Sequence, residues 1–300
     1  MEDLKDQIRN VHAYAVTPFS DDLLTVDLDN YGKNIEFMLD RGVKVVVVGG
    51  GTGEVNSLTV DELETMARHA LEVAGDRALV MPALPDNLGA AAELAPRYEK
   101  LGVRITLGMA PFVRNLIPED LNGVYHYYEI LAGLSGMALM PYNTQGWTAD
   151  FFAKLAEIES VIGIKDPCQH PHNLFQAVQL VGDRFVWIGN KRHDPGVLHL
   201  RFQMGIEAFT AGFTNFAPHF ELELFEAAQR KDWDRMVEIQ AQLAPLERLR
   251  NRHNEGVIKS ALDLVGLKGG KVRPPRTDCS EPGVAELREE LERLGVLSGK

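Results

Sequence analysis

The sequence predicts a (β/α)8 TIM barrel followed by a C-terminal helical extension, and three observations lead to this fold class. Eight short apolar runs recur along residues 1–220. Each run is continuously apolar rather than alternating, which is typical of strands that are buried on both faces. Longer segments with helical periodicity separate the runs, and only helical segments follow after residue 220.

The eight apolar runs predict the strands of the barrel. In chain order they cover residues 11–18, 43–50, 78–84, 103–110, 136–143, 161–166, 185–190 and 207–213. Regular alternation of such strands with helices favours a closed barrel. An open, doubly wound sheet is the alternative, because counting strands cannot establish that the sheet closes.

The segments between the runs carry helix signals. Residues 27–41 place their apolar side chains on one helical face. Thr59 and Glu62 have the spacing of a capping box, which predicts a helix from there to about residue 74. Gly42 and Gly102 each follow a helical segment and suit a C-terminal cap.

The C-terminal part of the chain is expected to form a separate helical bundle. Its predicted helices cover residues 221–229, 233–250, 255–265 and 283–294, with a Gly- and Pro-rich connection over 268–279. We therefore expect a barrel domain at 1–220 and a helical domain at 221–300. This region also carries a set of basic residues, which we interpret as a solvated helix face or subunit contact: Arg248, Arg250, Arg252, Lys259, Lys268, Lys271, Arg273 and Arg276.

Composition narrows the class of function. The 300 residues contain 31 Lys and Arg against 43 Asp and Glu, which gives a formal net charge of −12. Such a surface repels phosphate backbones, so we expect no nucleic-acid partner. The apolar runs are too short to cross a membrane. Two cysteines make no disulfide framework, and the N-terminal residues do not resemble a signal peptide, so a cytoplasmic location is expected.

The loops at the C-terminal ends of barrel strands carry the active site in this fold. Lys165 ends the sixth run, and Tyr142 ends the fifth. Desolvation in a barrel mouth lowers the pKa of a lysine, and a neutral amine is a nucleophile toward carbonyls. A phenol beside it is suited to proton transfer. The alternatives are a lysine that leans into solvent or pairs with Asp166, and an interfacial tyrosine with a hydrated hydroxyl.

A glycine-rich segment follows the second run at residues 49–54. Glycines let backbone N–H groups approach an anion, and Thr52 adds a hydroxyl donor. The segment matches neither a Walker loop nor G-x-G-x-x-G, so a small carboxylate is the better-sized ligand. A plain tight turn is the alternative.

Polar residues after two further strands are candidates for the distal part of a substrate. Asn190, Lys191, Arg192 and His193 follow the seventh run, and Arg114 follows the fourth. A cationic cluster in an acidic protein suits a second carboxylate or several hydroxyls, although an exposed loop is an equal alternative. The histidines lack metal-ligand spacing and the cysteines are unpaired, so no metal site is expected.

Three motifs, taken together and in order, give a family resemblance. They are Gly50-Gly51-Thr52-Gly53-Glu54 with Ser57-Leu58-Thr59 and Glu62, then Tyr142-Asn143, then Gly163-Ile164-Lys165-Asp166. This set resembles the N-acetylneuraminate lyase / dihydrodipicolinate synthase superfamily of class I lyases. Val16-Thr17-Pro18-Phe19 and Val272-Arg273-Pro274-Pro275 also match, so the likeness spans nearly the whole chain.

The resemblance implies a barrel with a C-terminal helical bundle, assembled as a tetramer or dimer, and it implies residue roles. Lys165 would form a Schiff base with C2 of a small 2-oxo acid. Gly51 and Thr52 would hold the substrate carboxylate, and Tyr142 would relay protons. The protonated imine then acts as the electron sink for dehydration or aldol cleavage, so no metal or other cofactor is implied.

Departures from the family pattern bear on the substrate. Dihydrodipicolinate synthases have a threonine where this chain has Gly51, a tyrosine at Val113 and an arginine at Trp147. Sialic-acid lyases have a proline at the position of Gln145. The glycine-rich motif and the segment 213–218 look most like the 5-dehydro-4-deoxyglucarate dehydratase branch.

We therefore expect a dehydratase or aldolase acting on a 2-oxo acid, with a 2-oxo sugar acid favoured. A synthase-like or sialic-acid-lyase-like pyruvate aldolase is the alternative within the family. A non-catalytic 2-oxo acid binder on the same barrel is the alternative from another class.

Overall fold

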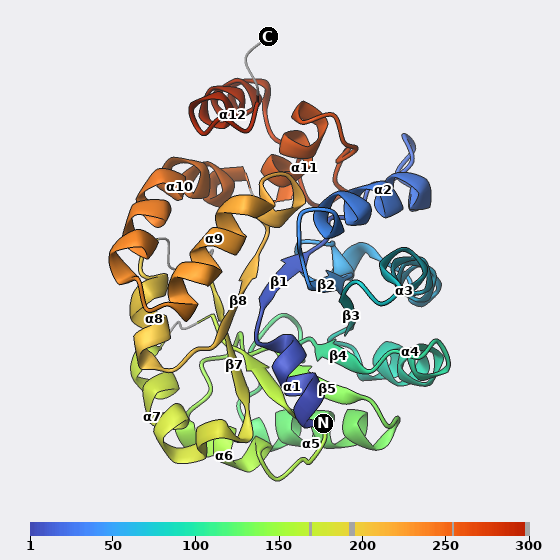
Figure 1. Ribbon diagram of the computed structural model, residues 1–300. Coiled ribbons are helices and arrows are strands. Elements are labelled where there is room, and N and C mark those ends of the chain that lie inside the picture. Colours follow the sequence, from blue (N-terminus) through green and yellow to red (C-terminus); the bar gives the residue numbers. More distant parts are fainter. Residues whose placement is uncertain (168–169, 192–195, 254, 298–300) are drawn as a thin grey trace.

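In the part of the chain that the structure describes, eight parallel strands form a barrel, as expected (Figure 1). The computed structural model describes residues 1–167, 170–191, 196–253 and 255–297. The strands are β1 (Val11–Tyr14), β2 (Val45–Val48), β3 (Leu79–Leu84), β4 (Ile105–Gly108), β5 (Ala138–Pro141), β6 (Gly163–Lys165), β7 (Val186–Asn190) and β8 (Ala208–Ala211). Each lies within one of the eight apolar runs.

Pairing between the first and last strands closes most of the sheet. The hydrogen-bonded order is β5-β4-β3-β2-β1-β8-β7-β6, so β1 lies between β2 and β8. Parallel bridges at Leu139–Val161 and Tyr142–Lys165 then join β5 to β6. This connection completes the ring and rules out the open, doubly wound alternative.

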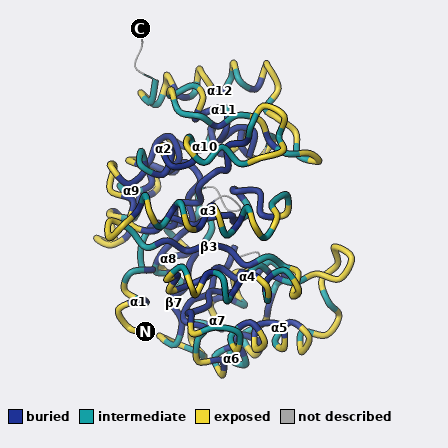
Figure 2. The backbone as a smooth tube through the Cα atoms, turned by 90° about the vertical axis from the view of Figure 1, so that its right-hand side faces the viewer, coloured by how far each residue is buried: buried dark blue, intermediate teal, exposed yellow. Residues whose placement is uncertain are grey.

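The strands form where they do because both of their faces are covered. All four valines of β2 are fully buried, one set facing the barrel interior and the other facing the surrounding helices. Figure 2 shows this layering as a buried inner tube surrounded by helices whose outer sides are exposed. The surrounding helices are α2 (Leu28–Leu39), α3 (Val60–Ala74), α4 (Leu88–Lys100), α5 (Leu121–Gly133), α6 (Ala149–Leu155), α7 (Pro171–Val181), α8 (Leu198–Met204) and α9 (Pro218–Gln229).

The expected capping box at the start of α3 is confirmed. The Thr59 side chain accepts a hydrogen bond from the backbone N–H of Glu62, and the Glu62 carboxylate accepts one from the backbone N–H of Thr59. Glu62 also forms a two-point ion pair with Arg273, at 2.6 and 2.9 Å. One carboxylate therefore starts a barrel helix and ties it to the C-terminal connection.

The sequence did not predict the first helix, α1 (Glu2–Ile8). It is short and its charges obscure the apolar face, of which Leu4 and Ile8 are buried. Ile8 packs over Gly163 of β6, and its carbonyl oxygen lies 2.8 Å from Nε2 of His12. These contacts cover the end of the barrel where the strands begin. No local sequence pattern predicts them.

Beyond α9 the chain forms α10 (Trp233–His253), α11 (Glu255–Leu264) and α12 (Glu281–Arg293), close to the predicted bounds. Figure 1 shows α11 and α12 at one edge of the barrel, with α10 against α9. The expected border between residues 220 and 221 falls inside α9, which packs against β1 and α10. The division into two domains stays a prediction.

Candidate active site

A cavity of about 250 Å³ opens where the strands of the barrel end. Strand ends β1, β5, β6, β7 and β8, the loop after β2 and the C-terminal extension all contribute to its wall. The described residues that line it are Tyr14, Gly51, Thr52, Tyr142, Lys165, Asn190, Thr210, Ala211, Gly212, Arg250, Glu255 and Arg276. Five of the residues singled out in the sequence thus meet in one cavity: Lys165, Tyr142, Gly51, Thr52 and Asn190.

Lys165 is the last residue of β6, and its side chain is 4% exposed. Tyr142 follows β5 and forms a parallel bridge with Lys165, which brings the two strand ends side by side. The backbone N–H of Asn143 donates to the Lys165 carbonyl at 2.8 Å and holds this register. The Lys165 Nζ lies 3.7 Å from the centre of the Tyr142 ring. The solvent-leaning alternative for Lys165 is therefore wrong.

A second aromatic ring near the amine comes from β1, a strand that does not pair with β6. Tyr14 ends β1, is almost completely buried, and has its ring centre 4.1 Å from the Lys165 Nζ. Burial, together with the neighbouring Tyr142, raises the pKa of Tyr14. The amine thus sits against the faces of two phenols, both of which line the cavity. Sequence reasoning missed Tyr14, although it ends the strand segment of the first predicted run.

Deeper in the barrel, His12 of β1 is fully buried. Burial, opposed by the hydrogen bond to the Ile8 carbonyl and aided by the nearby Lys165, lowers its pKa to about 4. The imidazole is therefore neutral at physiological pH and adds no positive charge beneath the lysine.

The glycine-rich loop has a conformation that requires its glycines. Gly49 has φ +62°, in the left-handed region, and a Cβ there would meet Leu63 at 2.4 Å. A Cβ on Gly53 would meet the Ala15 carbonyl oxygen at 2.9 Å. The Thr17 hydroxyl donates to the Gly53 carbonyl at 2.7 Å and fastens the loop to the end of β1.

A buried ion pair fastens the same loop to the C-terminal extension. Glu54, at the end of the glycine-rich segment, lies 2.6 Å from the Nζ of Lys259 on α11, and both side chains are fully enclosed. Burial lowers the pKa of Lys259, while Glu54 opposes the shift. Lys259 was interpreted from the sequence as part of a solvated face. That interpretation is wrong, because the extension folds onto the barrel and encloses this side chain.

The interpretation of the basic residues as a solvated face is also wrong for Arg250 of α10. Arg250 is 4% exposed, its Nη2 lies 3.4 Å from the Thr52 hydroxyl, and its guanidinium fits over Gly212, where a Cβ would clash at 2.7 Å. Glu255, the first residue of α11, and Arg276 line the cavity with it. The signal in the sequence was a run of basic residues, but nothing local indicated that two of them reach the barrel mouth.

The outer part of the cavity leads toward a larger one. Glu255 and Arg276 also line a hollow of about 630 Å³, together with Asn56, Ser57 and neighbouring residues of the extension. The Arg276 Nη1 donates to the Ser57 hydroxyl at 2.9 Å, which holds its guanidinium at the boundary between the two spaces. A ligand that fills the inner cavity could therefore extend past Arg276.

Two other sequence candidates fall elsewhere. Arg114 is exposed on the loop after β4, with φ +54°, and is not among the described residues that line the cavity. Arg192 and His193 lie outside the described residues. Trp147 is fully buried among Tyr128, Phe151 and other rings, so its position contributes to packing.

Lys191 was considered for the distal substrate site, and this interpretation is wrong. Its Nζ lies 2.6 Å from Glu221 of α9 and 2.8 Å from Glu247 of α10, and all three side chains are buried. Burial lowers the pKa of Lys191, but the two carboxylates outweigh it and raise the pKa above its usual value. Burial also raises the pKa of Glu221, and Glu247 adds to the shift. The triad joins the loop after β7 to two helices.

The part of the chain that the structure describes shows neither a metal site nor a membrane span. Within the described ranges, no group of three or more His, Cys, Asp and Glu side chains is arranged to hold a metal ion. The helices described are all too short or too polar to cross a bilayer.

The fold and this arrangement define a TIM-barrel protein with a cavity at the C-terminal ends of its strands. The sequence matches the dihydrodipicolinate synthetase family over residues 7–294, and the chain belongs to that family. It is similar to a protein of Oceanobacillus iheyensis named probable 5-dehydro-4-deoxyglucarate dehydratase, with 26% identity over 93% of this chain and 92% of the relative. It is also similar to the 4-hydroxy-tetrahydrodipicolinate synthase of Methanopyrus kandleri, with 28% identity over 97% and 98% of the two chains.

A solved structure supports the fold. The crystal structure of dihydrodipicolinate synthase from Oceanobacillus iheyensis superposes with a TM-score of 0.89 at 23% identity, covering 98% of this chain and 99% of that one. Relatives named as dehydratases and relatives named as synthases are thus about equally similar to this chain. Sequence identity alone does not separate the two reactions.

Proposed function

We propose that this protein is a Schiff-base-forming lyase, a dehydratase or aldolase, that acts on a 2-oxo acid. The observation that carries the proposal is the buried Lys165 amine, which lies against two phenol rings at the wall of a cavity that Thr52 also lines. Burial in a closed barrel excludes bulk water from the imine, and a neutral lysine amine there is a nucleophile. Membership of the family supports the same chemistry.

The proposed reaction starts when the neutral Lys165 amine adds to C2 of the substrate. Loss of water then gives a protonated imine, whose positive charge draws electrons from the adjacent C3 position. Either a C4 hydroxyl leaves, or the C3–C4 bond breaks. Tyr142, whose ring lies against the amine, relays protons during these steps.

The carboxylate end of the substrate is proposed to bind at Gly51 and Thr52. A side chain at position 51 would meet nothing within 4 Å, so this part of the loop borders open space. Arg250, next to the Thr52 hydroxyl, places positive charge at the same end. Charge-assisted hydrogen bonds of this kind hold a carboxylate more tightly than neutral donors do.

A sugar acid with a second carboxylate is the favoured substrate, because a second cation, Arg276, lines the cavity besides Arg250. Asn190, at the end of β7, adds an amide to the same wall. Arg192 and Arg114 stay predictions for the same distal role. The likeness to a named 5-dehydro-4-deoxyglucarate dehydratase supports this choice.

Arg276→Gln is expected to weaken binding of the dicarboxylate 5-dehydro-4-deoxyglucarate by about tenfold or more, the effect of losing one charge-assisted hydrogen bond. A 2-oxo-3-deoxy aldonic acid, which has one carboxylate, should be little affected. The measurement is the half-saturating concentration of each acid. Arg114→Gln is the comparison, and equal effects of the two variants would argue against a distal site at Arg276.

Covalent trapping tests the central proposal. Incubation with pyruvate followed by borohydride should add one reduced pyruvyl group to the protein, and peptide mass spectrometry should place it on Lys165. An unchanged mass, or a label on another lysine, would refute the Schiff-base mechanism. Optical bands of a flavin or pyridoxal group in the purified protein would instead favour a cofactor-dependent enzyme.

Two alternatives predict different results. A synthase-like or sialic-acid-lyase-like aldolase would also be trapped by pyruvate, but it would prefer an aldehyde as co-substrate to a deoxy sugar acid. The absence of an arginine at the buried position Trp147 disfavours the synthase. A non-catalytic binder would show thermal stabilisation by pyruvate that survives Lys165→Ala, with no turnover of any sugar acid.

Association of several copies, as a dimer or tetramer, is part of the proposal. The loop after β4 exposes a group of apolar side chains, which fits an interface between copies of this chain: Phe112, Val113, Leu116 and Ile117. Light scattering after size exclusion should give a mass of two or four chains. A mass of one 33.3 kDa chain at micromolar concentration would contradict it.

A further inference from the structure

Tyr14 has a buried polar group with no structural purpose among the described residues. Its hydroxyl oxygen is inaccessible to solvent and has no hydrogen-bond partner there. Leaving a phenol in this state costs free energy, because water is lost and nothing replaces it. A phenylalanine would fill the same space without that cost.

The position of the ring points to a ligand. Tyr14 lines the cavity that contains Lys165 and Tyr142, and its ring centre is 4.1 Å from the Lys165 Nζ. The loop after β2 makes room for the ring, since a Cβ on Gly50 would lie 2.7 Å from two of its carbon atoms. The hydroxyl therefore belongs to a tightly placed side chain at the wall of the cavity.

We propose that Tyr14 is a second catalytic acid–base residue, which serves the oxygen that leaves C2 and the proton that leaves C3 of the substrate. The proposal rests on the proposed Schiff-base function. It assigns a role to a residue on β1 that the sequence motifs did not include. The hydroxyl is closed to solvent in this structure, so the proposal requires the ring to turn toward the cavity when substrate binds. The substrate would then supply the hydrogen-bond partner that the hydroxyl otherwise lacks.

The protons and electrons balance as follows. After the amine adds and a proton moves from nitrogen to the former carbonyl oxygen, the Tyr14 phenol protonates the C2 hydroxyl. The C2–O bond breaks, water leaves, and the nitrogen lone pair forms the C2=N bond. The Tyr14 phenolate then removes a proton from C3, and the C3–H electron pair forms C2=C3 while the C=N pair returns to nitrogen. Tyr14 is thereby a phenol again.

The raised pKa of Tyr14 agrees with the first half of this cycle, because burial keeps the phenol protonated until the substrate needs its proton. Once the iminium has formed, its positive charge lies against the ring face and stabilises the phenolate. The same charge makes the C3 proton acidic. Tyr14 is thus protonated when the C2 hydroxyl needs a proton, and it is stabilised as a phenolate when C3 must lose one.

Tyr14→Phe separates this role from a structural one. Two rates should each fall by roughly 100-fold in this variant. The first is the exchange of pyruvate methyl protons in D2O, measured by proton NMR. The second is the rate of imine formation, measured by borohydride trapping. The half-saturating pyruvate concentration should stay unchanged, because the carboxylate contacts remain. The melting temperature should be unchanged or higher, since the variant removes an unsatisfied buried hydroxyl.

Tyr31→Phe is the matched control. Tyr31 on α2 is also fully buried, and its hydroxyl also lacks a partner among the described residues. It differs from Tyr14 because it is not among the described residues that line the cavity. This variant should keep both rates. Wild-type rates in Tyr14→Phe, or equal losses in the two variants, would overturn the proposal. A wild-type protein that pyruvate does not label would instead refute the Schiff-base function itself.

Discussion

Lys165→Arg should abolish imine formation and lower turnover of any substrate by roughly four to six orders of magnitude, the range for loss of a covalent nucleophile. A guanidinium stays charged and cannot form a stable imine, yet it keeps a cation between the rings of Tyr14 and Tyr142. Binding of the substrate carboxylate at Thr52 should therefore persist. The measurements are borohydride trapping, turnover and thermal stabilisation by pyruvate.

A matched lysine makes this experiment specific. Lys191 is as deeply buried as Lys165 and also lies beside an aromatic ring, with its Nζ 4.6 Å from the centre of the Phe213 ring. Its amine is held by two carboxylates, so it should carry no label in the wild-type protein. Turnover that survives Lys165→Arg, or a label on Lys191, would show that the nucleophile has been assigned wrongly.

Lys191→Met should produce the largest loss of stability, about 3–5 kcal/mol of the free energy of unfolding at neutral pH. Without the ammonium, the carboxylates of Glu221 and Glu247 stay buried beside one another with no neutralising charge from Lys191. Chemical denaturation measures the change. The loss should shrink as the pH falls, because Glu221, whose pKa is raised by burial, then takes up a proton and becomes neutral.

The sign of this pH effect follows from Glu221. Burial and Glu247 already raise its pKa in the wild-type protein. Removal of Lys191 takes away the larger of the two cationic groups that oppose the shift, and Arg250 remains. A carboxyl whose folded-state pKa is raised loses stabilising free energy as the pH rises through that pKa. The Lys191→Met variant should therefore lose the most free energy of unfolding at high pH.

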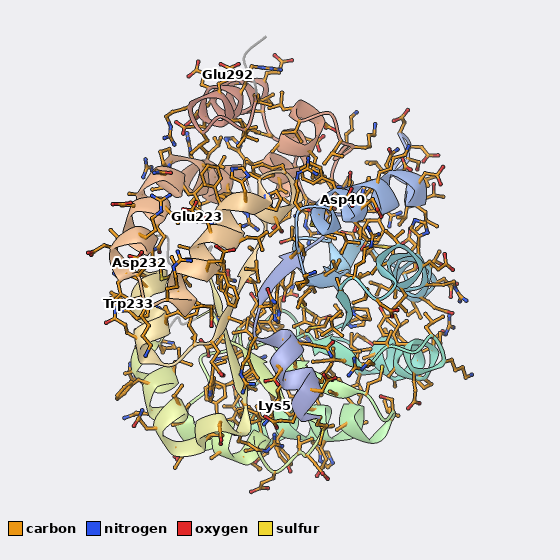
Figure 3. All side chains as sticks on the ribbon, in the orientation of Figure 1. Lys5, Asp40, Glu223, Asp232, Trp233 and Glu292 are labelled. Atoms are coloured by element: carbon orange, nitrogen blue, oxygen red, sulfur yellow. The ribbon has the colours of Figure 1, made fainter. Side chains whose placement is uncertain are left out.

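An exposed ion pair provides the control for Lys191→Met. Arg235 on α10 forms ion pairs with Glu223 of α9 and with Glu238, and all three side chains are open to solvent. Figure 3 labels Glu223. Arg235→Met should cost at most about 1 kcal/mol, because water screens such pairs. Equal losses in the two variants, or a Lys191→Met loss that does not depend on pH, would contradict the explanation by buried charge.

The two lysines also show what separates a reactive from a structural buried amine. Lys191 and Lys165 both lie at strand ends in the barrel mouth, and from the sequence both could be placed at the active site. The carboxylates that hold Lys191 come from α9 and α10, 30 and 56 residues further along the chain. Only the packing of these helices decides that one amine is locked into an ion triad.

Local signals carried much of the fold and part of the site. Strands buried on both faces must be continuously apolar, so all eight were predictable near their observed positions. Lys165 ends β6, Tyr142 directly follows β5, and Thr52 lies in the loop after β2. Parallel strands place these ends at one rim of the barrel. Their meeting in one cavity was therefore predictable from chain position alone.

The sequence by itself determined the eight strands and placed Lys165 and Tyr142 near strand ends, because strands buried on both faces must be continuously apolar. The bridges between β5 and β6 decided that the sheet closes. Tertiary structure alone decided which cations enter the site. Arg250 contacts Thr52 across 198 residues of chain, and it does so because α10 and α11 fold back over the barrel mouth. A basic residue on a helix looks the same in sequence whether it faces solvent or a cavity, and only long-range packing, which no local pattern encodes, distinguishes the two.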